Sequence, residues 1–147
     1  RGITVSLGAD GAPCNNNLDI FQEMKMAALI QKPLRGPTVM PAKEVFKLAT
    51  LGGAKAMGQE DSIGSIEVGK KADLVLISLE GAHVNPTTDI DPYSLLVYSL
   101  RSTDVILTMV DGKILMEDRQ LKTIELKKIV LDSSKALIRL KERAGIR

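Results

Sequence analysis

Asp10 is the residue of this chain whose type and position best suit chemistry. It follows an alternating apolar run at residues 3–7 that predicts a β-strand, and βα folds build their active sites just past the carboxyl ends of strands. A carboxylate there can bind a metal ion, accept a proton from water on that metal, or do both. Asp-Gly is also a common turn pair, so the position alone leaves a plain turn residue as the alternative.

Four further side chains near Asp10 could contribute to a site. Asn15 and Asn16 could line a substrate pocket, and helix capping is the alternative, because Asn accepts hydrogen bonds from backbone N–H groups at a helix start. Cys14 has no His near it in sequence to activate a thiolate, so we do not expect a nucleophile there. We expect Glu23 to lie on the flank of the following helix.

Metal-ligating side chains are scarce. The 147 residues include one His, His83, and one Cys, whereas a hydrolase zinc site usually uses two or three imidazoles. We therefore expect this chain alone to bind no metal ion. We expect His83, in a polar loop, to be structural or solvent-exposed, and Asp73, at the start of a strand, to form an ion pair or a cap.

Composition excludes several classes of protein. Lys+Arg total 20 and Asp+Glu 18, for a formal net charge of +2, and there are two Tyr, two Phe and no Trp, so we expect no nucleic-acid partner. An apolar fraction of 44% with 26% charged residues is typical of globular proteins. No apolar run approaches the roughly 18 residues of a membrane span. A single Cys is typical of a reducing compartment, so we expect a cytoplasmic location.

The first part of the chain predicts a strand, a loop and two helices. Apolar residues recur at helical spacing over 18–31, and any of Asn15, Asn16 and Asn17 could cap this helix. A second helix is predicted over 41–57. Gly52 and Gly53 lie in its middle, where each costs about 1 kcal/mol relative to Ala, so we expect close packing against a neighbouring element.

The second part of the chain predicts antiparallel strands and a final helix. We expect a hairpin at 62–69, a strand within 72–79, and strands at 105–110 and 113–117 joined by an Asp-Gly turn. Residues 93–100 are compatible with helix or strand. About the last 22 residues predict an amphipathic helix, whose apolar positions share one face and whose Lys and Arg lie on a solvated face. These apolar positions are Leu126, Ile129, Val130, Leu137 and Leu140.

Four ordered motifs make the chain resemble the amidohydrolase superfamily, in the branch of methylthioadenosine/S-adenosylhomocysteine deaminases, guanine-deaminase-like enzymes and triazine chlorohydrolases. The first is LGADGAPCNNNLD at 7–19, continued by FQEM at 21–24. The others are ATLGGAKAMG at 49–58, GSIEVGKKADLV at 64–75 and VDGK at 110–113. The series covers nearly the whole chain.

This resemblance implies an α/β fold that is the C-terminal fragment of a metal-dependent (β/α)8-barrel hydrolase plus part of its accessory β-sandwich. Residues 1–58 would be the last strand and helices of the barrel, 59–121 part of the sandwich, and 122–147 a terminal amphipathic helix. Asp10 matches the family's strand-eight aspartate, which ligates the metal and shuttles a proton. The remaining ligands of the family are absent from this sequence, so an N-terminal part of the same enzyme is expected to be missing.

The function implied is deamination of an adenosine-like or guanine-like ring by a metal-bound hydroxide. The metal would be one divalent ion, zinc or alternatively iron, and the partners a small-molecule substrate and further copies of the enzyme, with no membrane. One alternative is a triazine-type chlorohydrolase with the same mechanism. Another, of a different class, is a non-catalytic α+β interaction module. The 147-residue chain alone is expected to be inactive.

Overall fold

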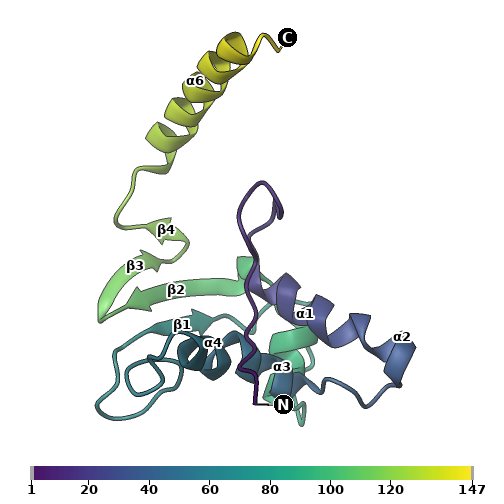
Figure 1. The fold of residues 1–147 in the computed structure, drawn as a ribbon. Helices are drawn as coiled ribbons and strands as arrows, with labels where there is room; N and C mark the ends of the chain where they lie inside the picture. Colours follow the sequence, from purple (N-terminus) through teal and green to yellow (C-terminus); the bar gives the residue numbers. More distant parts are fainter. Residues whose placement is uncertain (1, 147) are drawn as a thin grey trace.

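The N-terminal half of the protein is helical. In the computed structural model, which describes residues 2–146, an irregular N-terminal segment leads into four helices (Figure 1). They are α1 (Ile20–Ile30), α2 (Lys32–Arg35), α3 (Ala42–Ala49) and α4 (Leu51–Ala56).

Helix α1 confirms the predicted helix but not its predicted cap. The carboxylate of Asp19 accepts hydrogen bonds from the backbone N–H groups of Phe21 and Gln22, so the three asparagines before it do not cap the helix. Asp19 has the extended backbone of an N-cap residue, with φ −113° and ψ 105°. Its charge also interacts favourably with the helix dipole, which favours Asp over the neutral Asn at this place.

The single helix predicted over 41–57 is wrong, because Thr50 divides it into α3 and α4. Thr50 has φ −122° and ψ −93°, and its hydroxyl donates to the carbonyl of Phe46 at 2.8 Å. The expected close packing is confirmed at Gly52, where a Cβ would lie 3.0 Å from the carbonyl oxygen of Lys47 and 3.1 Å from that of Val5. A Cβ on Gly53 would meet nothing within 4 Å.

Residues 3–7, predicted as a strand, form no strand within the described chain. The segment is tied to α3 by one backbone hydrogen bond, from the N–H of Leu7 to the carbonyl of Leu48 at 3.1 Å. Leu7 also packs against the helical core, whereas Ile3 and Val5 are 75% and 58% exposed. A strand needs a hydrogen-bonded neighbour, and no other part of residues 2–146 supplies one here.

The C-terminal half contains one antiparallel sheet with the strand order β1-β2-β3-β4. Its strands are β1 (Leu74–Ile77), β2 (Val105–Val110), β3 (Lys113–Glu117) and β4 (Gln120–Leu121). Three predicted strands are thus confirmed, the first of them shorter than its predicted window. Asp111 and Gly112 form the turn between β2 and β3 with φ of 50° and 76°, as a two-residue hairpin requires.

The hairpin predicted at residues 62–69 is wrong, because these residues form turns without strand pairing. The ammonium group of Lys70 donates to the carbonyl of Glu60 and to the hydroxyl of Ser65, both at 2.6 Å. The N–H of Lys71 donates to the carbonyl of Ser62 at 2.9 Å. Hydrogen bonds from Lys70 and Lys71, just after this segment, therefore hold its turns in place of a strand pairing.

Short helices connect the sheet to the helical half. Residues 93–100, for which the sequence leaves helix and strand open, are mostly helical: α5 (Pro92–Ser94) leads into a π-helical turn, η1 (Leu95–Ser99). A 3-10 turn, η2 (Ser102–Asp104), then leads into β2. Val97 of η1 packs into the main core between α1 and α3, whose buried members are Met24, Ala28, Ala42, Val45 and Val97.

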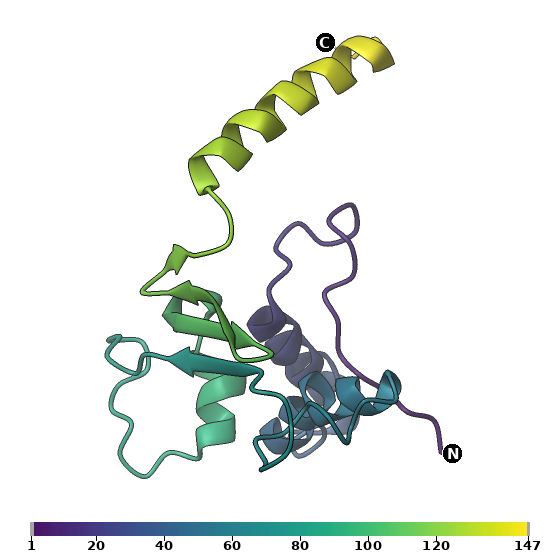
Figure 2. The same ribbon diagram turned by 90° about the vertical axis from the view of Figure 1, so that its left-hand side faces the viewer.

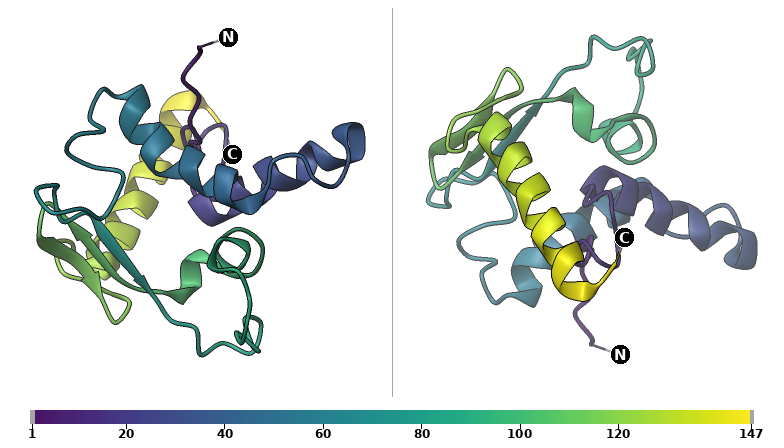
Figure 3. Two further views of the ribbon diagram at one scale, coloured as in Figure 1. Left: turned by 90° about the horizontal axis from the view of Figure 1, so that it is seen from below. Right: turned by 90° about the horizontal axis from the view of Figure 1, so that it is seen from above.

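Helix α6 (Leu126–Ala144) confirms the predicted terminal helix. It stands apart from the rest of the protein beyond β4 (Figure 2). Seen from above, its projection runs from the sheet across the rest of the ribbon (Figure 3). Its predicted apolar face is uncovered, with exposed fractions from 44% at Ile129 to 60% at Leu126. Within residues 2–146, none of the helices combines the length and the apolar character that crossing a membrane would take.

Candidate functional site

Asp10 lies at the start of an exposed loop, residues 10–19, that projects from the helices before turning back into α1 (Figure 1). Its φ is 58°, in the left-handed region that Asp tolerates better than most residues. One carboxylate oxygen accepts from the N–H of Gly11 at 2.7 Å, and the side chain is exposed. The carboxylate is therefore held by the turn while remaining accessible.

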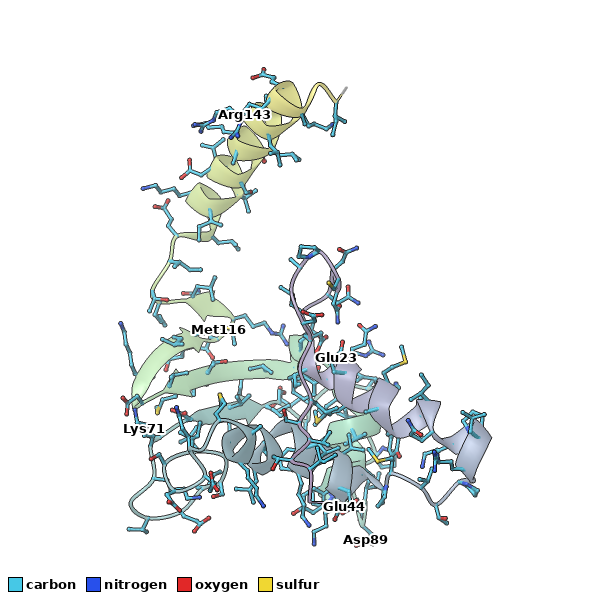
Figure 4. The ribbon with its side chains drawn as sticks, in the orientation of Figure 1. Glu23, Glu44, Lys71, Asp89, Met116 and Arg143 are labelled. Atoms are coloured by element: carbon cyan, nitrogen blue, oxygen red, sulfur yellow. The ribbon has the colours of Figure 1, made fainter. Side chains whose placement is uncertain are left out.

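The side chain of Asn15 is hydrogen-bonded to α1 and to the loop, whereas Asn16 is exposed. The side-chain amide of Asn15 donates from Nδ2 to Oε1 of Glu23 at 2.5 Å, and its Oδ1 accepts from the N–H of Asn17 at 3.1 Å. Glu23 lies near the start of α1, close to where the loop joins the helix (Figure 4). The sequence places Glu23 on a helix flank, but nothing in the sequence indicates its bond to Asn15.

Cys14 is exposed, and its N–H donates to the carbonyl of Gly11 at 2.9 Å. Asp73, which precedes β1, accepts a hydrogen bond from the N–H of Asp111 at 2.7 Å. This bond fastens the turn between β2 and β3 to the start of β1. Asp73 therefore has the structural role that its position predicts.

His83 forms a half-buried pair with Asp104, away from the Asp10 loop. Its Nε2 lies 2.9 Å from Oδ2 of Asp104, which also accepts from the N–H of Arg101 at 2.9 Å. Burial alone would raise the pKa of Asp104, but the hydrogen bonds from His83 and Arg101 lower it by more, so the net pKa lies below the usual value. The pair links the loop after β1 to η2, which is a structural role for His83.

An open hollow of about 380 Å³ lies between the start of α1 and residues 100–103. Its wall includes Phe21, Lys25 and Arg101, and the hydroxyl of Ser102 donates to Asp19 across it at 2.8 Å. Asp10 does not line this hollow. The candidate site is therefore the exposed loop that carries the Asp10 carboxylate.

The described residues do not form a metal site by themselves. Among residues 2–146 there is no group of three or more His, Cys, Asp or Glu side chains that could hold an ion. A tetrahedral zinc site needs three or four donors, and Asp10 can supply one of them. The donor set present here is therefore incomplete for a metal ion.

Comparison with known proteins defines the class to which this loop and this fold belong. The sequence profile described as the amidohydrolase family matches residues 1–115. The chain therefore belongs to the amidohydrolase family, which confirms the resemblance derived from its motifs.

Two similar relatives are deaminases. The 5'-deoxyadenosine deaminase of Methanosarcina barkeri is 43% identical over 146 residues, which are 99% of this chain and 33% of that protein. The 5-methylthioadenosine/S-adenosylhomocysteine deaminase of Acetivibrio thermocellus is 48% identical over 130 residues, 88% of this chain and 30% of that protein. The chain thus spans about one third of the length of the curated relatives it matches.

Solved structures of similar fold include two enzymes with zinc. An adenosine deaminase from Xanthomonas campestris with bound zinc matches with a TM-score of 0.89 and 33% identity, over 95% of this chain and 32% of that one. An atrazine chlorohydrolase from Arthrobacter aurescens complexed with zinc matches with a TM-score of 0.78 and 29% identity, over 91% and 30%. This chain therefore has the α/β fold of a segment of such enzymes.

Proposed function

We propose that this protein is part of an amidohydrolase that deaminates the amino-substituted ring of an adenosine-like substrate. The observation that carries the proposal is the 43% identity over 99% of the chain with an enzyme named 5'-deoxyadenosine deaminase. A guanine-like substrate remains within the same reaction class. A triazine chlorohydrolase is the second candidate. It is supported by the similarity in fold to an atrazine chlorohydrolase, whose TM-score of 0.78 is lower than the 0.89 of the adenosine deaminase.

The proposed reaction is hydrolytic. Water adds to the ring carbon that bears the amino group, the carbon–nitrogen bond breaks, and ammonia leaves while the ring gains an oxygen. One proton must move from the attacking water to the departing nitrogen, and a single positioned carboxylate can carry it. We assign this transfer to Asp10, because it is an accessible carboxylate on the loop that opens the first family motif.

A divalent metal ion, zinc or alternatively iron, is part of the proposal because two similar structures are described with zinc. When bound, such an ion makes water a stronger nucleophile near neutral pH. Asp10 would be one ligand, and Asn16 would contact substrate. The other ligands would come from residues beyond this chain, so the active enzyme would include a further part of the same protein.

The proposed architecture follows the same division as the motifs. Residues 1–58 would complete a (β/α)8 barrel, with the segment 3–7 as its last strand, residues 59–121 would belong to an accessory β-sandwich, and 122–147 would form the terminal helix. The exposed apolar side chains of the segment 3–7 support this proposal, because they need a covering neighbour. A homo-oligomer and a cytoplasmic location stay predictions.

Asp10→Asn in the intact enzyme tests the function. The substitution keeps the size and an acceptor oxygen but removes charge and basicity, so we expect kcat for ammonia release from 5'-deoxyadenosine to fall by at least about 10²-fold. Cys14→Ser and His83→Ala serve as controls and should change kcat by less than about tenfold.

Chloride release from atrazine with no ammonia release from adenosine-like substrates would favour the chlorohydrolase. Turnover of neither substrate would favour an interaction module. Near-normal turnover of Asp10→Asn would make Asp10 a plain turn residue.

A further inference from the structure

The hydrogen bond between Asn15 and Glu23 joins the Asp10 loop to helix α1. Both side chains are half-buried, whereas the neighbouring bonds from Asn17 to Gln22 and from Gly11 to Asp10 are exposed. Hydrogen bonds to an ionised acceptor are shorter and stronger than neutral ones. This contact is therefore a firmer side-chain connection between the loop and the helix than the exposed bond from Asn17 to Gln22.

The chemistry of the pair fixes the orientation of the Asn15 amide. A carboxylate such as Glu23 only accepts hydrogen bonds, so the NH₂ group of Asn15 must face it. The oxygen of the amide then faces the N–H of Asn17, from which it accepts at 3.1 Å. Each polar atom of the Asn15 side chain thus has a suitable partner within the protein.

A continuous set of hydrogen bonds leads from this pair to the proposed catalytic carboxylate. The backbone N–H of Asn15 donates to the carbonyl of Gly11 at 3.0 Å. The N–H of Gly11 in turn donates to the carboxylate of Asp10 at 2.7 Å. A displacement of Asn15 would therefore move the peptide that holds Asp10.

We propose that Asn15 and Glu23 are positioning residues that hold the Asp10 carboxylate in place for the deamination reaction. The inference rests on the function proposed above. It gives Asn15 a positioning role in place of the expected substrate contact, because Glu23 and the N–H of Asn17 hold the two ends of its amide; the substrate contact stays a prediction, which the Michaelis constant tests. Partners of this kind, which hold a metal ligand in position, typically change activity by about 10- to 100-fold when removed.

An exchange of the two groups tests this proposal in the intact enzyme. Asn15→Asp alone sets two carboxylates against each other, and we expect kcat to fall by about 10- to 100-fold. Glu23→Gln alone keeps an acceptor oxygen and should cost less than about threefold. Combining Asn15→Asp with Glu23→Gln restores one donor and one acceptor with unchanged side-chain lengths, so we expect kcat to return to within about threefold of the wild type.

The Michaelis constant separates positioning from substrate contact. Neither residue touches substrate in this proposal, so KM should change by less than about threefold in all three variants while kcat changes. Glu44→Gln is the matched control, because this glutamate lies on α3 in an exposed pair with Lys47. Equal melting temperatures would show that the variants fold.

Hydrogen–deuterium exchange of peptides covering residues 10–19 gives a readout that does not depend on activity. Exchange should rise in Asn15→Asp and return to the wild-type level in the combined variant. If the wild-type enzyme does not deaminate adenosine-like substrates, the proposed function fails, and this exchange result alone decides whether the pair orders the loop. A combined variant as impaired as Asn15→Asp, or an Asn15→Asp variant like the wild type, would overturn the proposal.

Discussion

Asp104 is the one charged residue that is buried among residues 2–146, at 7% exposure. Its carboxylate accepts from both His83 and the N–H of Arg101, and the N–H of Asp104 donates back to the carbonyl of Arg101 at 3.0 Å. These bonds close the turn that leads into β2. A buried carboxylate is tolerated only when its partners compensate for lost hydration, and here the partners are His83 from the loop after β1 and Arg101 from the same turn.

Asp104→Ala should lower the free energy of unfolding by about 1–3 kcal/mol at pH 7, because it leaves two donors without an acceptor. Since the pKa of Asp104 is lowered in the folded state, its stabilising effect is present above the unfolded-state pKa of about 3.9 and is lost as the pH falls through the lower folded-state value. The difference between wild type and variant should therefore narrow below about pH 4. Urea unfolding at pH 7 and pH 3 measures it.

Asp132→Ala is the matched control for this experiment, because Asp132 lies exposed on α6. It should change the free energy of unfolding by no more than about 0.5 kcal/mol at either pH. A gap between wild type and Asp104→Ala that stays constant from pH 7 to pH 3 would contradict the charged role of Asp104.

At the scale of secondary-structure elements, the sequence predicts those elements whose conformation is determined by neighbouring residues. The Asp-Gly turn at 111–112 and the apolar runs beside it correctly predict the hairpin of β2 and β3. The same approach fails at residues 62–69, where side-chain hydrogen bonds determine the conformation of the chain. The side chain of Lys70 organises residues 60–65 into turns, and no sequence periodicity reveals such a contact.

The candidate site, too, is predictable from the sequence only in part. The motif around Asp10 is recognisable from the sequence, and so is the helix that follows. The choice of Asp19 over three neighbouring asparagines as the cap depends on backbone angles, and the contact between Asn15 and Glu23 spans a loop of irregular shape. Spacing alone cannot predict either feature, because both depend on how the loop turns back.

The neighbouring glycines of α4 give a test at this scale. Gly52→Ala would place a Cβ 3.0–3.1 Å from the carbonyl oxygens of Lys47 and Val5, so we expect a loss of about 1–3 kcal/mol in the free energy of unfolding. Gly53→Ala meets open space and should stabilise the helix by up to about 1 kcal/mol. Chemical denaturation of both variants measures the difference. Equal effects would contradict the close approach of residues 2–9 to α4.

At the scale of the whole molecule, exposed large apolar side chains are most numerous on α1 and α6. On α1 they include Met26, Leu29 and Ile30, at 54%, 45% and 59% exposure. On α6 the uncovered apolar residues extend from Leu126 to Leu140. Together with the unpaired segment 3–7, these are the surfaces that the further part of the proposed enzyme would cover.

The 147-residue chain produced alone should neither retain zinc nor release ammonia from adenosine-like substrates. The reason is the donor count, since one carboxylate at Asp10 and a His83 committed to Asp104 provide no tetrahedral set. Zinc content after dialysis against a mild chelator measures this. Stoichiometric zinc in the dialysed chain would contradict the assignment of Asp10 as one ligand among several from elsewhere.

The alternation of side chains in residues 3–7 has a consequence for the accuracy of assembly. In a strand, a slip of one residue moves every side chain to the opposite face and shifts the chain by about 3.3 Å. If this segment pairs as proposed, such a slip would turn Ile3, Val5 and Leu7 away from their apolar neighbours and withdraw Asp10 by the same step. Burial of the apolar side chains would therefore select the correct strand register, because only the pairing that buries them also places the Asp10 carboxylate at the proposed site.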